Sequence, residues 1–227
     1  MVNEGIWQQA DSLLKRALAV ISGINLPTDD NWHIVVVVNL YQAYERLASV
    51  SMLLVKGYRD SADVLTRSLF EVAVNLSYIA KDVEKRLPEY LRHGGFPVSK
   101  EEVEQLERRL RQKPRPELKD IVPGQAWKPL RDMCDDLGWS EEYCTFYRFV
   151  STVDHAGSFK LGTSYMQLLK REQPSDWDKS AVLITALCFY LRVAEVAARV
   201  FPNQIKAEAI AELSAQCNEM GQFFAES

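Results

Sequence analysis

Arg148 and His155 are the residues whose types and spacing could act together on a phosphate group. They lie seven positions apart, about two turns if the segment is helical, so both would share one face with Ser151. Arginine can bind a phosphate through two hydrogen bonds and stabilise developing negative charge. Histidine, with an unperturbed pKa of about 6.5, can transfer a proton at neutral pH. The pair predicts phosphoryl chemistry, such as deprotonation of a ribose 2′-hydroxyl that attacks the adjacent phosphate without a metal.

A structural interpretation of this pair remains open. A histidine near a helix end, two residues before Gly157, can interact with the helix dipole or with terminal carbonyl groups. Arg148 can also pair with Glu141 or Glu142, one to two turns earlier on the same helix. Arginine and histidine at this spacing are common on helices, so the spacing alone favours the structural interpretation.

A second set of polar residues, called the polar stripe below, follows one face of a predicted helix at steps of four, four, three and four: Arg67, Glu71, Asn75, Tyr78 and Asp82. The other faces of this helix are apolar, so we expect the stripe to face a groove or another helix. Charges placed there need partners, which Arg67 and Glu71 can provide at i, i+4. The stripe then either fixes helix register or brings Arg67 and Arg148 together around an anion, with Asn75, Tyr147 and Ser151 as further binding residues.

Helix-start and helix-stop residues recur along the chain and predict an all-α bundle of seven to nine helices. The β-branched run 34–38 favours a strand by composition, but the apolar residues that follow have helical spacing. The expected helices are 4–22, a long one from the turn 27–30 to near Gly57, 61–80, 82–94 with Pro88 in its second turn, a charged one beginning at Ser99, 127–137, one capped by Ser140 and reaching about Asp154, a long apolar one from Ser175 to Pro202, and a last one to the C-terminus.

The chain is expected to form one domain, 1–227, that carries a surface insertion near 99–124. The insertion begins with a capping box and a highly charged stretch, EEVEQLERRLRQK, which has few apolar residues to bury. Pro114, Pro116 and Pro123 then interrupt regular helix.

The composition, 47% hydrophobic and 26% charged, is that of an ordinary folded protein. A net charge of −4 gives no global reason to bind DNA or an anionic membrane. No run approaches about 20 apolar residues and the N-terminus resembles no signal peptide, so we expect a cytoplasmic protein. Four widely separated cysteines are expected to be reduced and mostly packed, and neither a metal nor a cofactor is expected.

Two blocks of the sequence resemble a bacterial family known only as a domain of unknown function. One contains R-x-L-F-E (Arg67 to Glu71) and the other Y-R-x-x-S-x-x-x-H (Tyr147 to His155). More distantly, Arg148 with His155 is similar to the R-x(4–6)-H signature of the HEPN superfamily of helical proteins. The chain departs from the usual HEPN ribonuclease pattern at Phe149, where a polar residue commonly follows the arginine.

The HEPN resemblance implies Arg148 and His155 as the catalytic pair of a metal-independent ribonuclease of a toxin–antitoxin or defence system. It also implies a homodimer, with RNA or a nucleotide as ligand and an antitoxin-type protein as a further partner. Other HEPN proteins are not catalytic, so a binding or assembly module with a structural polar stripe is the alternative. A purely structural partner protein is a third class, and it predicts a large exposed apolar patch.

Overall fold

The computed structural model describes residues 3–25, 30–94, 104, 108, 127–147 and 176–225. These ranges contain no strand, which confirms the all-α bundle. The elements in the described part of the chain are α1 (Asn3–Ser22), α2 (Asn31–Val55), α3 (Arg59–Ala80), α4 (Val83–His93), α6 (Leu130–Leu137), α7 (Ser140–Glu142), the π-helix η2 (Tyr143–Tyr147), α10 (Asp176–Val200) and α11 (Ala207–Ala225).

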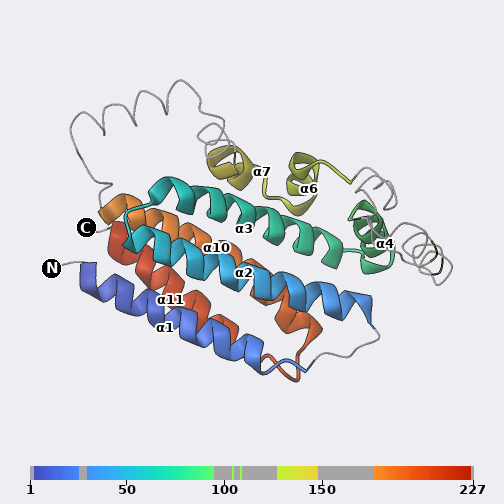
Figure 1. Ribbon diagram of the computed structural model, residues 1–227, viewed down its shortest axis with the longest axis horizontal. Coiled ribbons are helices and arrows are strands. Elements are labelled where there is room, and N and C mark those ends of the chain that lie inside the picture. Colours follow the sequence, from blue (N-terminus) through green and yellow to red (C-terminus); the bar gives the residue numbers. More distant parts are fainter. Residues whose placement is uncertain are drawn as a thin grey trace.

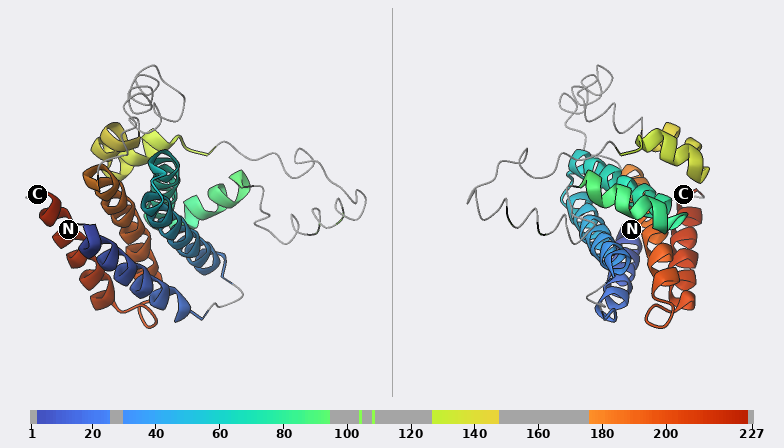
Figure 2. Two further views of the ribbon diagram at one scale, coloured as in Figure 1. Left: turned by 60° about the vertical axis from the view of Figure 1, so that its left-hand side comes forward. Right: turned by 90° about the vertical axis from the view of Figure 1, so that its right-hand side faces the viewer.

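The long helices form a bundle around α10 (Figure 1). α10 contacts α2, α3 and α11, and α1 lies along α2 and also contacts α11. Figure 2 shows α11, in red, beside α10, in orange. The short helices α4 and α6 contact α3, and α7 continues from α6 into η2. The segment 127–147 therefore lies against α3, the helix that carries the polar stripe.

α10 packs against three other long helices and contains a long apolar segment. Residues Lys179–Val200 are long and apolar enough to cross a membrane by length and composition, contrary to the expectation that no segment approaches this length. In the bundle, 61% of the apolar stretch within this segment is buried. Burial against α2, α3 and α11 accounts for this composition, because a helix with neighbours on most sides needs apolar residues around most of its circumference.

The β-branched run of α2 is helical, as predicted from the spacing of the residues that follow it. Val36 and Leu40 begin a face that is completely buried at most of its positions and continues through Ala43, Leu47, Val50 and Leu54. Burial of this face in the bundle outweighs the modest preference of valine and isoleucine for strands.

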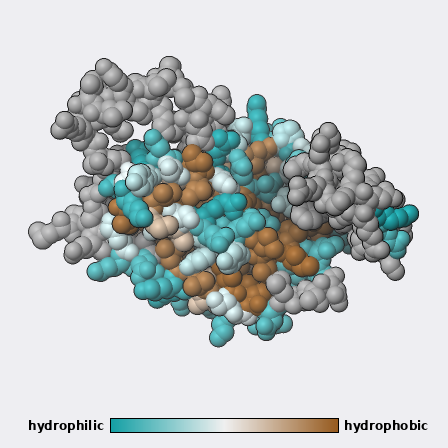
Figure 3. All heavy atoms as spheres, in the orientation of Figure 1, coloured by the Kyte–Doolittle hydropathy of each residue, from teal (hydrophilic) through white to brown (hydrophobic). Residues whose placement is uncertain are grey.

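The opposite, exposed face of α2 carries several apolar side chains together with Glu45. Five side chains on it are 37–63% exposed: Ile34, Val38, Tyr41, Met52 and Val55. Figure 3 shows apolar side chains, in brown, gathered among polar ones on the side of the molecule where α2 and α3 lie. Exposed apolar side chains that gather on one face can mark a place where another molecule packs.

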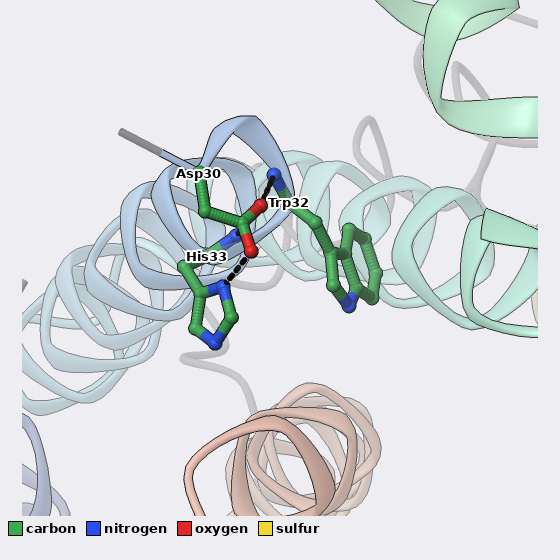
Figure 4. A network of polar contacts seen from close by, with 3 residues as sticks. All are labelled: Asp30, Trp32 and His33. Carbon is green, nitrogen blue, oxygen red and sulfur yellow. Dashed lines mark hydrogen bonds and ion pairs between the residues drawn. The ribbon is translucent and has the colours of Figure 1, made fainter. Parts of the chain in front are cut away.

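Asp30 begins α2 as its N-cap residue, as predicted from the turn that precedes the helix. Its Oδ1 accepts the N–H of Trp32 at 2.8 Å, and its Oδ2 contacts Nδ1 of His33 (Figure 4). The His33 ring also packs edge-on against Phe201, with ring centroids 5.0 Å apart. Burial alone would raise the pKa of Asp30, but the hydrogen bonds from Trp32 and His33 outweigh it and lower that pKa.

Replacement of Asp30 by alanine is expected to lower the free energy of unfolding by about 1 kcal/mol, because the first turn of α2 loses its side-chain acceptor. Asp30→Asn keeps an acceptor and should lose less. Because the folded-state pKa of Asp30 is lowered, its contribution is complete above the unfolded-state pKa and lost as pH falls through the folded-state value. Urea unfolding at neutral and acidic pH checks both points, and equal stability of Asp30→Ala and wild type at neutral pH would contradict the cap.

Other helix ends also follow the predicted signals. Gly57 and Gly138 have φ values of +83° and +77°, the left-handed conformation that glycine adopts most easily after a helix. Asp82 accepts the N–H of Lys85 at 3.4 Å and caps α4, which contains Pro88 as expected. The insertion expected near 99–124 lies outside the described residues except for Glu104 and Arg108, which are helical.

The prediction that Ser140 caps a helix reaching about Asp154 needs correction in its described part. Ser140 is the first residue of α7, and its hydroxyl donates to Asp135 Oδ1 at 2.6 Å instead of capping the helix. Within the described residues the α-helical pattern ends at Glu142 and continues as the π-helix η2. Residues 148–154, which complete the predicted helix, lie outside the described part.

Tyr190 is 1% exposed in the centre of α10, and no described residue forms a hydrogen bond with its hydroxyl. Burial raises the pKa of this hydroxyl, so the group stays protonated. Burying a polar group without a partner costs free energy. Tyr190→Phe is therefore expected to raise the free energy of unfolding by about 1 kcal/mol. Thermal and urea unfolding measure this, and a loss of stability would contradict the unpartnered hydroxyl.

Candidate functional site

The structure describes some of the predicted site residues and not others. Arg67, Glu71 and Asn75 lie on α3, and Tyr147 is the last residue of η2. Arg148, Ser151 and His155 lie outside the described residues. The structure therefore places four of the seven predicted site residues, and Tyr147 directly precedes the rest in the chain.

Arg67, Glu71 and Tyr147 form one hydrogen-bonded network across the junction between α3 and η2. Nη2 of Arg67 donates to the Tyr147 hydroxyl at 2.9 Å, and this hydroxyl donates to Oε1 of Glu71 at 2.9 Å. Nε of Arg67 lies 3.4 Å from the same Glu71 oxygen, so the predicted i, i+4 ion pair is present. The tyrosine hydroxyl uses both its acceptor and its donor capacity to join the two charged residues.

The environment of this network keeps Tyr147 protonated. Burial and the hydrogen bond to Glu71 raise the pKa of Tyr147, although the hydrogen bond from Arg67 opposes them. The guanidinium carbon of Arg67 also lies 4.7 Å from the centroid of the Tyr147 ring, close enough for a cation–π interaction. Arg67 therefore holds both the hydroxyl and the ring of Tyr147.

An aromatic cluster packs behind the network. Phe70, completely buried on α3, contacts one ring from α10 and two from η2. The centroid of its ring lies 4.9 Å from that of Phe189, 5.7 Å from Tyr147 and 6.1 Å from Phe146. Tyr143 stacks on Tyr147 within η2, with centroids 5.3 Å apart. These contacts anchor η2 on α3 through apolar area as well as through hydrogen bonds.

Asn75, the next residue of the polar stripe, binds Trp127, which lies in the same segment 127–147 as Tyr147. Nε1 of Trp127 donates to Oδ1 of Asn75 at 2.8 Å. The Trp127 ring packs edge-on against Tyr78, with centroids 5.7 Å apart. Asn75 is therefore the partner of a tryptophan, a contact that residue spacing did not identify.

Two cations, Arg86 and Lys128, lie against the Tyr78 ring, and residue spacing did not identify either contact. Arg86 places its guanidinium carbon 3.7 Å from the Tyr78 ring centroid and donates from Nη1 to the Tyr78 carbonyl at 2.7 Å. Lys128 lies 5.4 Å from the same centroid and forms an ion pair of 2.5 Å with Asp136. The only signal in the sequence was the aromatic residue on a polar face, because the two cations come from other elements.

The described contacts join the polar stripe to the segment 127–147 and to α4. Arg67, Glu71, Asn75 and Tyr78 all contact residues 127–147, and Asp82 caps α4. Arg67 and Glu71 therefore face another helix, η2, as expected, whereas Asn75 and Tyr78 contact Trp127, which precedes α6. Arg67 already contacts Glu71 and Tyr147, and whether it also converges with Arg148 on an anion stays a prediction.

The described residues of the candidate site, Arg67, Glu71, Asn75 and Tyr147, offer hydrogen bonding and charge. Among the described residues, no group of three or more His, Cys, Asp or Glu side chains is placed to hold a metal ion. Proton transfer at neutral pH would depend on His155, to which Tyr147 is linked by a short stretch of chain.

Comparison with known proteins identifies a family for this chain. A model described as a family of unknown function (DUF5677) matches residues 33–173. No curated protein and no solved structure matches. The matched range covers more than half of the chain and includes both the polar stripe and the segment from Arg148 to His155. The chain therefore belongs to this family of unknown function.

Proposed function

We propose that this protein is a HEPN-like, metal-independent endoribonuclease with Arg148 and His155 as its catalytic residues. The observation that supports the proposal is the double hydrogen bond of Tyr147 with Arg67 and Glu71. This network holds Tyr147, the residue directly before Arg148, against α3. A catalytic segment must be held in place for its groups to meet the substrate in a productive geometry.

In this mechanism His155 removes the proton from a ribose 2′-hydroxyl. The 2′-oxygen then forms a bond to the adjacent phosphorus, the bond to the 5′-oxygen breaks, and the leaving oxygen takes up a proton. Arg148 binds the phosphate and stabilises the negative charge that develops on it. Ser151 lies between the two in the sequence and contributes a hydrogen bond to the phosphate. Arg67, Glu71, Asn75 and Tyr147 act as positioning residues.

The same proposal includes a bacterial, cytoplasmic homodimer in a toxin–antitoxin or defence system, with an antitoxin-type protein as a second partner. The exposed apolar side chains of α2, from Ile34 to Val55, support the dimer. Such side chains are stabilised when another molecule covers them, and a second copy can do so. Light scattering should give the mass of two chains, whereas the mass of one chain would contradict the dimer.

A non-catalytic binding or assembly module is the second candidate, and a specific observation favours it. The described members of the polar stripe contact other residues of the same chain, as expected if the stripe serves helix packing. Such a protein would bind a nucleotide or a small anion without turnover.

The two candidates are separated by incubating the purified wild-type protein with a labelled single-stranded RNA in excess EDTA. The ribonuclease is expected to release fragments that end in a 2′,3′-cyclic phosphate, and Arg148→Ala should abolish them. Arg199→Ala, which removes an exposed arginine from the last turn of α10, is the matched control and should keep the activity.

Absence of cleavage by the wild-type protein would contradict the ribonuclease. In that case thermal unfolding with nucleotides tests the binding module. A ligand at about 100 times its Kd stabilises a protein by about 2.7 kcal/mol, a clear shift in Tm. If neither nucleotides nor phosphate shifts the Tm, the binding module is contradicted as well.

A further inference from the structure

Two thiols from different helices meet between α10 and α11. Sγ of Cys188 lies 3.7 Å from Sγ of Cys217, and both cysteines are free. Cys188 is exposed, whereas Cys217 is 2% exposed. The expectation of mostly packed cysteines therefore holds for Cys217 and not for Cys188.

The pair consists of one reactive thiol and one protonated neighbour. The hydrogen bond with Cys217 and the charge of Arg192 together outweigh burial and lower the pKa of Cys188 to about 7. The hydrogen bond with Cys188 raises the pKa of Cys217, and burial adds to this shift. At neutral pH Cys188 therefore supplies the thiolate, which is the form of cysteine that reacts.

We propose that Cys188 and Cys217 form a redox modification site, at which a hydroperoxide oxidises Cys188 and Cys217 then closes an intramolecular disulfide between α10 and α11. The geometry supports the second step, because the sulfur atoms are already in contact. Side-chain rotation needs to bring them from 3.7 Å to the bonded distance of about 2.05 Å. The exposure of Cys188 gives the oxidant access to the reactive sulfur.

The chemistry proceeds in two balanced steps. The Cys188 thiolate attacks the terminal oxygen of the hydroperoxide, a sulfur–oxygen bond forms, the oxygen–oxygen bond breaks, and an alcohol leaves after taking up a proton. The Cys217 sulfur then attacks the sulfenic acid of Cys188. A sulfur–sulfur bond forms, the sulfur–oxygen bond breaks, and the leaving hydroxide takes the Cys217 proton to become water. Two thiols are oxidised and one hydroperoxide is reduced.

The other two cysteines provide internal comparisons. Cys134 is completely buried, and burial raises its pKa to about 12, so we expect it not to react. Cys144 is exposed in η2 and tests whether exposure alone is enough for oxidation.

The experiment is mass spectrometry of the full-length protein after treatment with a small molar excess of a hydroperoxide. The wild-type protein is expected to lose the mass of two hydrogen atoms and to yield a linked peptide pair containing Cys188 and Cys217, and dithiothreitol should reverse both changes. Cys144→Ser, the matched control, should behave like the wild type. Cys217→Ser should instead accumulate a sulfenic acid on Cys188 that dimedone traps.

Two results would overturn the proposal. One is wild-type protein in which Cys188 and Cys217 remain free to alkylation while Cys144 is oxidised. The other is a linked peptide pair that still forms when either Cys188 or Cys217 is replaced by serine. Alkylation of the unfolded, untreated protein gives the reference state of all four thiols. None of these measurements depends on ribonuclease activity.

Discussion

His155→Ala is expected to lower the rate of metal-free RNA cleavage by at least 100-fold. The reason is that a positioned general base accelerates proton transfer by about 10²–10⁴-fold, and alanine removes the only proton acceptor that the proposal assigns to the 2′-hydroxyl. Initial rates of cleavage of a labelled RNA, measured in EDTA at saturating substrate, check this prediction. The 2′,3′-cyclic phosphate ends should disappear together with the activity.

His93→Ala is the matched control for this variant. His93 ends α4 and stacks on Trp127, with ring centroids 6.4 Å apart. Its loss therefore affects the packing of the segment 127–147 without removing the proposed base. This control is expected to keep most of the activity. If His155→Ala cleaves as fast as the wild type, the activity belongs to another residue or to a contaminant, and the assignment of His155 is wrong.

Phe70→Ala is expected to lower the free energy of unfolding by about 3–5 kcal/mol, the range found when a buried phenylalanine is truncated to alanine. Phe70 is completely buried and joins α3 to Phe189 of α10 and to Phe146 and Tyr147 of η2. Its loss therefore removes apolar burial and leaves a cavity where three elements meet. Urea unfolding followed by circular dichroism measures the change.

Two comparisons make the Phe70 result interpretable. Phe70→Leu keeps an apolar side chain of similar volume and should lose less than about 1.5 kcal/mol. Tyr58→Ala removes an aromatic residue that is 60% exposed, and its effect should stay within about 0.5 kcal/mol. A loss below about 1 kcal/mol for Phe70→Ala would mean that the ring is not closely packed in solution.

Local signals were enough to predict most of the described helices. Asp30 and Asp82 are side-chain acceptors at helix starts, and Gly57 and Gly138 supply the left-handed conformation after helix ends. These effects act within a few residues, so they can be read along the chain. The π-helix η2 was not predicted, because its residues, YCTFY, carry no cap or breaker that distinguishes it from an α-helix.

The residues of the polar stripe could be predicted from the sequence, but the residues that they contact in other elements could not. The i, i+4 pairing of Arg67 with Glu71 follows from helix geometry. The contact of both residues with Tyr147 spans 80 and 76 positions of the chain, and that of Asn75 with Trp127 spans 52. Periodicity shows which face of a helix is polar, whereas tertiary packing decides which element covers that face.

The anchoring of Tyr147 on α3 is tested most directly by a double-mutant cycle in the free energy of unfolding. The cycle compares Arg67→Met, Tyr147→Phe and the double variant with the wild type. Tyr147→Phe keeps the ring, so the coupling reports the hydroxyl that joins Arg67 to Glu71. Arg67→Met combined with Tyr58→Phe serves as the control pair, because Tyr58 is exposed, and should be additive.

We expect a coupling free energy of about 1 kcal/mol between Arg67 and Tyr147, within the range of about 0.5–3 kcal/mol for residues in one hydrogen-bonded network. Effects of Arg67→Met and Tyr147→Phe that add to within about 0.3 kcal/mol would show that the two residues do not interact in solution. That result would contradict the anchoring of Tyr147 and remove the observation that supports a catalytic segment at Arg148 and His155.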